Sequence, residues 1–176
     1  MEKQVFCLIG ASGTGKTTQA WNLANQIVQN GYLVGGILAP GTFCEEKRFS
    51  FDIVDFMTQE KRFLAKKGMP SSITIGPFGF SQDGFSFGYN AIQKAISQRV
   101  DLLILDEIGP LELQNKGWFS SLKDALNSEV PNILITMRPG LFLEVQKTFF
   151  QNHRTWECPV CESSPILAFF PKRSNL

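Results

Sequence analysis

The sequence has few cysteines, almost no net charge and no long apolar run. Its four cysteines are too few and too unevenly spaced for a disulfide scaffold. The net charge of +1 gives neither nucleic acid nor an acidic membrane an electrostatic attraction. No apolar run approaches the roughly 18 residues of a membrane span, and strand-like residues follow Met1 with no signal peptide pattern. We therefore expect a cytoplasmic protein with reduced thiols and no membrane partner, and the charge does not favour nucleic acid as a main partner.

The composition and length are those of an ordinary globular domain. Hydrophobic residues make up 43% of the chain and charged residues 19%. A chain of 176 residues is long enough to bury a sizeable core. No repeat, low-complexity tract or linker divides it. We expect residues 1–176 to form a single domain.

A glycine-rich loop near the start of the chain carries the clearest chemical signal. Residues Gly10–Thr17 read GASGTGKT, the phosphate-loop pattern of a glycine followed four residues later by Gly-Lys and Ser or Thr. The apolar run at 5–9 predicts a buried strand before the loop. Apolar residues at helical spacing predict a helix over 17–30, with Gly31 placed as its C′ residue. This context favours a nucleotide site over a chance glycine-rich turn.

Each residue type in this loop suits a polyphosphate. Glycines allow a tight turn with inward N–H groups, and the helix N-terminus adds its free donors and dipole. Lys16 is expected on the β- and γ-phosphates, and the Thr17 hydroxyl on magnesium. The predicted nucleotide-binding residues are Gly10, Ala11, Ser12, Gly13, Thr14, Gly15, Lys16, Thr17 and Thr18.

The rest of the chain alternates between strand and helix patterns. Strands are predicted at 32–39, 72–75, 100–105 and 132–136, a β-hairpin at 42–65, and terminal strands at 155–157 and 165–170. Helices are predicted at 88–98 and 117–127, with one more through Leu141, Val145 and Phe149. The glycine- and aromatic-rich stretch 76–84 is a candidate lid or base platform, or an ordinary packed loop. The pattern predicts an α/β fold, a mostly parallel sheet flanked by helices with an appended β-hairpin.

Charged residues follow two of the predicted strands. Asp106 and Glu107 end the apolar strand at 100–105, and Arg138 follows the strand at 132–136. Ligands bind at the carboxyl ends of strands in such folds, so these side chains can converge with the phosphate loop. Asp106 suits a magnesium site held through water, and otherwise a strand cap. Glu107 is the candidate base for an attacking water, and otherwise a solvated loop carboxylate.

Two arginines and two cysteines leave alternatives open. Arg138 is our first candidate for neutralising transition-state charge, together with Lys16, and Arg48 in the predicted hairpin is the second. Each arginine also fits an ordinary surface position. Cys158 and Cys161 form half of a zinc pattern, but a turn with two thiols is favoured because a full site needs further ligands.

The phosphate loop and the stretch Leu105–Glu112, which reads LDEIGPLE, together resemble the THEP1-type nucleoside-triphosphatase family. The resemblance covers about residues 4–140 and includes segments at 48–53 and 75–80, where Ser50 and Phe78 depart from the family's Gly and Tyr. It implies a RecA-like phosphate-loop NTPase fold. It also implies magnesium-dependent hydrolysis of nucleoside triphosphates with loose base choice.

The sequence leaves three functions to weigh. Hydrolysis is the leading hypothesis. The second is a nucleotide or small-molecule kinase, but such enzymes usually carry an arginine-rich lid, and the sequence has no such cluster. A nucleotide-dependent adaptor with low turnover is the third. The guanine-reading Asn-Lys-x-Asp pattern is absent, so ATP, GTP or other triphosphates all remain candidate substrates. The sequence points to no particular protein partner.

Overall fold

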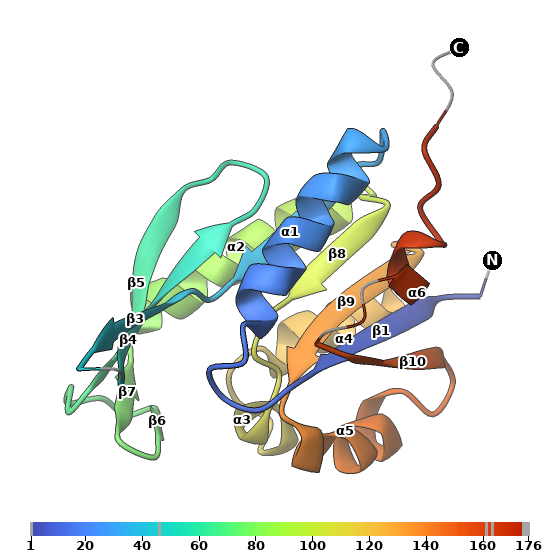
Figure 1. The fold of residues 1–176 in the computed structure, drawn as a ribbon. Coiled ribbons are helices and arrows are strands. Elements are labelled where there is room, and N and C mark those ends of the chain that lie inside the picture. Colours follow the sequence, from blue (N-terminus) through green and yellow to red (C-terminus); the bar gives the residue numbers. More distant parts are fainter. Residues whose placement is uncertain (1, 46, 161, 163, 174–176) are drawn as a thin grey trace.

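The computed structural model describes residues 2–45, 47–160, 162 and 164–173. One large sheet runs through the molecule, with helices on both faces (Figure 1). Five parallel strands form one half, in the order β10 (Arg154–Pro159), β1 (Gln4–Ile9), β9 (Asn132–Met137), β8 (Leu102–Leu105) and β2 (Val34–Leu38). The expected α/β fold and its parallel core are confirmed.

The other half of the sheet is an antiparallel extension of five strands. It comprises β3 (Gly41–Cys44), β4 (Lys47–Asp55), β5 (Lys61–Lys67), β6 (Thr74–Ile75) and β7 (Phe78–Phe80). β4 joins the two halves by pairing with β2, and β4 and β5 form the predicted hairpin. The extension is larger than a hairpin because β3 adds to β4, and β7 adds to β5 and carries β6.

Two hydrophobic layers hold the helices to the sheet. Strand side chains alternate between the faces, so Phe6 and Leu8 of β1 face α1 (Lys16–Gln29), with Ile27 in the same cluster. Cys7 and the other odd residues of β1 face the opposite layer. That layer contains α2 (Gln82–Ser97), α4 (Phe119–Asn127) and α5 (Phe142–Phe149). Figure 1 shows α1 in front of the sheet and α2 behind it.

Three sequence predictions were wrong. The second long helix begins at Gln82 rather than 88, because Ser81 caps it by accepting a hydrogen bond from the Gly84 amide. The stretch 76–84 is therefore not a loop, since it contains β7 and the start of α2. No strand forms at 165–170, where α6 (Ser164–Leu167) is followed by a turn. Ile166 and Phe170 lie four residues apart, and both are buried in the α1 layer.

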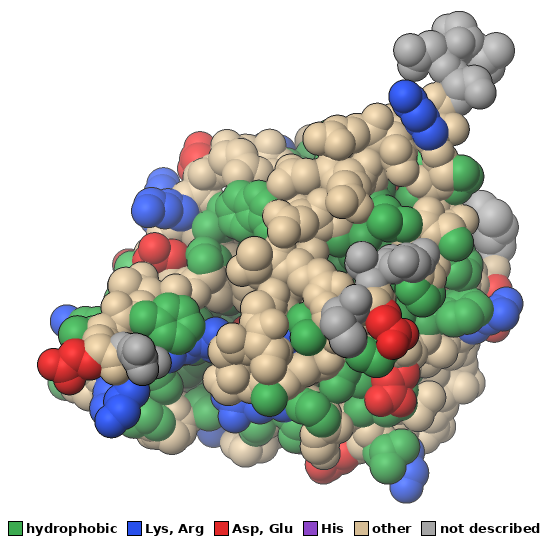
Figure 2. Space-filling view, viewed as in Figure 1, with side chains coloured by type: hydrophobic (Ala, Val, Ile, Leu, Met, Phe, Trp, Pro, Cys, Tyr) green, Lys and Arg blue, Asp and Glu red, His purple; other side chains and the backbone are tan. Residues whose placement is uncertain are grey.

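The surface around the extension mixes apolar and charged side chains. Figure 2 shows lysine and arginine side chains beside hydrophobic ones on the left, where Figure 1 places β3, β4 and β5. Phe43, Phe49 and Phe63 are the exposed aromatic residues of these strands. No helix in the described ranges is long and apolar enough to cross a membrane.

Candidate active site

The phosphate loop connects β1 to α1, as predicted. Gly13 and Gly15 have φ angles of 81° and 86°, a left-handed conformation that favours glycine. The Thr14 hydroxyl and the Lys16 ammonium both donate to the Ala11 carbonyl, at 2.9 and 3.0 Å. No side chain caps α1, so its first amides are free to meet an anion. The loop is held in shape for a phosphate chain.

A first cavity, here called the phosphate cavity, has a volume of about 190 Å³. One wall is the loop and the first turn of α1, with Gly13, Gly15, Lys16, Thr17 and Thr18. The opposite wall contains Gly41, Phe43 and Arg48 from the extension, and Glu107. Gly10, Ala11, Ser12 and Thr14 of the predicted set shape the loop without lining this cavity. The predicted lysine, threonines and carboxylate therefore meet in one place.

Asp106 is fully buried at the end of β8 and is held by both neighbouring strands. One carboxylate oxygen accepts from the Ala39 amide at 2.8 Å, and the other accepts from the Thr136 hydroxyl of β9. Burial raises the pKa of Asp106 and the nearby Glu107 charge adds to this, whereas hydrogen bonds from Thr136, Ala39 and Thr17 oppose it. Asp106 thus lies beside Thr17, the other predicted metal ligand.

The pair of Thr17 and Asp106 fits a hard divalent cation. A hydroxyl and a carboxylate are oxygen donors, and magnesium keeps several waters when one or two protein oxygens hold it. Both Asp106 oxygens already accept protein hydrogen bonds, which suits contact with a metal through water. Sequence reasoning missed Thr136. The available signal was a single hydroxyl within an otherwise apolar strand, Asn132–Met137.

Lys16 is almost completely buried beneath the loop. Burial lowers its pKa, while the charges of Glu107 and Asp106 act in the opposite direction. Both carboxylates thus lie close enough to favour the charged ammonium. A buried cation facing a cavity is suited to binding a phosphate oxygen.

Glu107 adopts a left-handed backbone conformation, with φ of 62°. Such a conformation costs a non-glycine residue on the order of 1–3 kcal/mol, and Glu45, Gln59, Arg99 and Asn115 of this chain also adopt it. Here the Glu107 amide donates to the Thr136 hydroxyl at 2.9 Å, which fixes the turn. The side chain reaches both the phosphate cavity and the cavity beside it. One carboxylate oxygen lies 3.3 Å from Arg48, and no described residue donates to the other.

Arg48 is brought to this carboxylate by the packing of the extension. Its guanidinium lies 4.8 Å from the ring centre of Phe51 and 5.5 Å from that of Phe43. Gly41 leaves room for it, since a Cβ there would approach Arg48 Nε to 2.7 Å. That nitrogen is buried and has no hydrogen-bond partner among the described residues. Arg48 lines both the phosphate cavity and the neighbouring one, whereas Arg138 lines only the neighbouring one, with Ser12.

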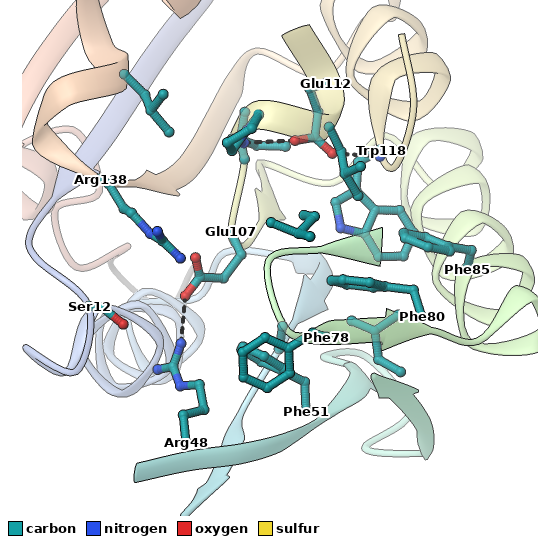
Figure 3. Close-up of a pocket in the computed structure, with 18 residues that line it drawn as sticks. Ser12, Arg48, Phe51, Phe78, Phe80, Phe85, Glu107, Glu112, Trp118 and Arg138 are labelled. Carbon is teal, nitrogen blue, oxygen red and sulfur yellow. Dashed lines mark hydrogen bonds and ion pairs between the residues drawn. The ribbon is translucent and has the colours of Figure 1, made fainter. Parts of the chain in front are cut away.

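The second cavity, here called the aromatic cavity, has a volume of about 150 Å³ (Figure 3). Its polar end contains Ser12, Arg48, Glu107 and Arg138. The wall opposite is aromatic and is formed by Phe51, Phe78, Phe80, Phe85 and Trp118. Figure 3 shows Glu107 between the two arginines, with the aromatic rings on its other side. The predicted platform at 76–84 thus contributes Phe78 and Phe80 to a cavity wall.

Glu112 also lines this cavity and holds the backbone beside the aromatic wall. It is buried and accepts hydrogen bonds from the Gly109 and Trp118 amides, both at 2.7 Å. These bonds hold α3 (Pro110–Leu113), a short helix that the sequence did not predict, and the segment carrying Trp118. Burial is the main cause that raises the pKa of Glu112 to about 7. Glu112, the final glutamate of the LDEIGPLE stretch, therefore has a structural role.

The structure describes only one of the two cysteines in the possible zinc pattern. Cys158 is buried in β10, and burial raises the pKa of its thiol to about 11. Cys161 lies outside the described residues, so the pair itself is not tested. Within the described ranges no three His, Cys, Asp or Glu side chains gather as a metal cluster.

The fold and site define a phosphate-loop nucleotide-binding α/β protein. The family model described as NTPase matches residues 5–154. The chain is 32% identical over 128 residues to nucleoside-triphosphatase THEP1 of Methanopyrus kandleri, covering 73% of this chain and 70% of that protein. It is 34% identical over 127 residues to the THEP1 of Pyrococcus abyssi, covering 72% and 70%. The chain belongs to this THEP1-type family of nucleoside-triphosphatases.

Two solved structures share the fold. The crystal structure of THEP1 from Aquifex aeolicus has a TM-score of 0.69 and 18% identity, covering 97% of this chain and 99% of that one. The solution structure of a human cancer-related nucleoside triphosphatase has a TM-score of 0.66 and 19% identity, covering 88% of each chain. At these identities the likeness supports the fold alone.

Proposed function

We propose that this enzyme hydrolyses the γ-phosphate of nucleoside triphosphates with magnesium, and that Glu107 is its general base. The observation that carries the proposal is the phosphate cavity. It has the phosphate loop and Lys16 on one wall, and Glu107 with Arg48 on the other. A triphosphate seated on the loop places its terminal phosphate between these two walls.

The loop amides and Lys16 bind the phosphate oxygens in this proposal. Thr17 and Asp106 hold magnesium, which supplies positive charge to the β- and γ-phosphate oxygens when bound. Asp106 keeps its orientation because Ala39 and Thr136 fix its two oxygens. The metal ligands therefore do not need to rearrange when the nucleotide enters.

Glu107 orients a water on the far side of the γ-phosphate and accepts its proton. Arg48 lies 3.3 Å from one oxygen of this carboxylate. We propose that the γ-phosphate competes for the Arg48 guanidinium, which leaves the carboxylate to the water and places positive charge where the transition state develops negative charge. Arg138 is the second proposed arginine, acting from the aromatic cavity.

Base choice is proposed to be loose, with ATP and GTP both accepted. The relatives are named for nucleoside triphosphates without a particular base, and the chain has no guanine-reading pattern. We also propose a cytoplasmic location, which the free thiols of Cys7, Cys44 and Cys158 support.

The test is phosphate release from ATP, GTP, CTP and UTP, with and without magnesium and with no acceptor. We expect release from several of these with magnesium and a loss of at least about a hundredfold on chelation. Lys16→Ala should lose most triphosphate affinity, because Lys16 meets the phosphates directly. Lys123→Ala, on the exposed face of α4, is the matched control. Unchanged titration of ATP into folded Lys16→Ala would contradict the phosphate-loop assignment.

A further inference from the structure

Hydrolysis uses only the polar end of the aromatic cavity. Hydrolysis needs one water between the γ-phosphate and Glu107, and the phosphate cavity accommodates that water. The aromatic cavity begins on the other side of Glu107 and adds about 150 Å³. Its aromatic wall offers water no hydrogen-bond partners. A space of about this volume holds one benzene-sized molecule, and here its polar end adds partners for a hydroxyl.

We propose that the aromatic cavity binds a small alcohol with one aromatic ring, and that the enzyme transfers the γ-phosphoryl group to its hydroxyl. This inference rests on the proposed function, because it uses the same phosphate cavity and the same carboxylate. It adds a second substrate and a second product, a phosphate monoester, with Arg48 and Arg138 in place of the arginine-rich lid of other kinases.

The wall of the cavity selects a flat ring. Phe85 packs against two rings of the wall. Its ring stacks on that of Phe80, with 5.5 Å between ring centres, and it meets the ring of Trp118 edge-on, with 4.9 Å between ring centres. Phe78 meets Phe51 edge-on at 5.2 Å. These separations lie within the range in which aromatic rings attract one another, so a ligand ring finds the same contacts. The volume limits the ligand to about one ring with a short arm.

The polar end of the cavity selects a hydroxyl on that arm. A carboxylate there can pair with Arg48 and Arg138, but it has no proton for Glu107 to accept. An ammonium faces Arg48 and Arg138 and has no lone pair with which to attack. A neutral hydroxyl donates to the free oxygen of Glu107 and keeps a lone pair for phosphorus. In-line transfer requires this hydroxyl at the side of the γ-phosphate that faces away from the leaving diphosphate.

The transfer step balances without any further reactant. The hydroxyl oxygen forms a bond to the γ-phosphorus, and the bond from that phosphorus to the bridging oxygen breaks. The electron pair of the broken bond stays on the nucleoside diphosphate. The hydroxyl proton passes to Glu107 and then to solvent. Water takes the place of the alcohol when the cavity is empty, and this gives the hydrolysis proposed above.

The test uses the full chain with ATP, magnesium chloride and either benzyl alcohol or 2-phenylethanol. Phosphorus NMR separates the monoester from free phosphate. We expect one monoester formed for each additional ADP, and none with benzyl methyl ether, which has the ring but no hydroxyl. Saturation-transfer NMR on the wild type should detect both alcohols bound to the protein.

Two phenylalanines of the extension provide a matched pair of variants. Phe78 forms part of the cavity wall, while Phe49 on β4 is exposed and lines neither cavity. Phe78→Ala should weaken the apparent affinity for either alcohol by roughly tenfold, and Phe49→Ala should leave it unchanged. Equal weakening by both variants would contradict the assignment of the cavity.

The remaining outcomes separate this inference from the proposed function. Release of free phosphate alone, at every alcohol concentration, overturns the transfer and leaves the hydrolase intact. Failure of both alcohols to bind the wild type overturns the aromatic site in the same way. A wild type that turns over no ATP, with or without alcohol, defeats the proposed function itself.

Discussion

At the scale of single residues, Arg48 and Arg138 differ in which cavities they line. Arg48 lines the phosphate cavity and pairs with Glu107, with only 17% of its side chain exposed. Arg138 follows β9 and lines only the aromatic cavity. We therefore expect the larger catalytic contribution from Arg48, although the sequence alone favours Arg138 for its place after a strand.

Replacing Arg48 with alanine should lower kcat for ATP hydrolysis by roughly a thousandfold, since an arginine at a transferred phosphoryl group contributes that much. Arg138→Ala should lower kcat by less than about tenfold. The matched control is Arg62→Ala, because Arg62 is exposed on β5 and lines neither cavity. Steady-state phosphate release measures all three. If the order of the two effects were reversed, Arg138 would be the catalytic arginine.

At the scale of elements, Glu112 links the stability of α3 and the aromatic wall to pH. The folded protein holds the Glu112 proton more tightly than the unfolded chain does, because burial raises the pKa from 4.5 to about 7. Its contribution is therefore fully present below about pH 4.5 and is lost as the pH rises through about 7. A shift of this size corresponds to roughly 3 kcal/mol of unfolding free energy.

Urea unfolding of the wild type and Glu112→Gln, near pH 4.5 and near pH 8.5, measures this contribution. Between these pH values the wild type should lose roughly 3 kcal/mol more unfolding free energy than the variant, which has no proton to release at this position. All other titrating groups are common to the two proteins. Parallel pH profiles would show that Glu112 titrates normally.

The packing of α2 on the aromatic wall gives a second prediction at this scale. A Cβ at Gly88 would collide with the ring of Trp118. Gly88→Ala gains up to about 1 kcal/mol of helix propensity, but overpacking a core costs typically about 1–3 kcal/mol. We expect net destabilisation, measured by urea unfolding. Gly140→Ala is the control, because no atom outside its chain neighbours lies within 4 Å of the added Cβ. If Gly88→Ala were more stable than wild type, the Trp118 ring would move aside without a cost in free energy.

Local patterns predicted the elements whose signal lies in adjacent residues. The phosphate loop, the strand before it and the apolar strand ending in Asp106 are of this kind. The strand predicted at 165–170 failed because Ile166 and Phe170 suit either a strand or a turn of helix, and contact with α1 decides between them. The second long helix was predicted to begin at residue 88 rather than Gln82, because Gly84 and Gly88 weaken the local helix signal.

Contacts between segments far apart in the chain could not be predicted from the sequence. Thr136 meets Asp106 only because β9 lies beside β8. Arg48 reaches Glu107 only because the extension folds across the strand ends. The aromatic cavity needs Phe51, Phe80 and Trp118 together, and they come from three separate segments. No periodicity in one segment contains that information.

At the scale of the whole molecule, the site lies where the two halves of the sheet meet. The parallel half supplies the phosphate loop, Asp106 and Glu107 at the strand ends. The antiparallel extension supplies Arg48 and much of the aromatic wall. We propose that the phosphate machinery acts as in other phosphate-loop enzymes, while the extension sets which group attacks. That residues 1–176 act as a single domain stays a prediction.

The central claim is that Glu107 acts as the base while other groups bind the nucleotide. Glu107→Gln keeps the shape of the side chain and removes the basic oxygen. Lys16, the loop amides and Asp106 remain to hold the phosphates and the metal. ATP affinity should therefore stay within about threefold of wild type. The rate of hydrolysis should fall by about a hundredfold to ten-thousandfold, the usual contribution of a general base.

Single-turnover hydrolysis of ATP beside equilibrium binding, for wild type and Glu107→Gln, tests this claim most directly. Asp106→Asn is the companion variant, and it should weaken magnesium dependence and nucleotide binding together. The account predicts a Glu107→Gln protein that binds ATP normally and is slow to cleave it. Cleavage within about threefold of the wild-type rate would contradict the account and place the base elsewhere.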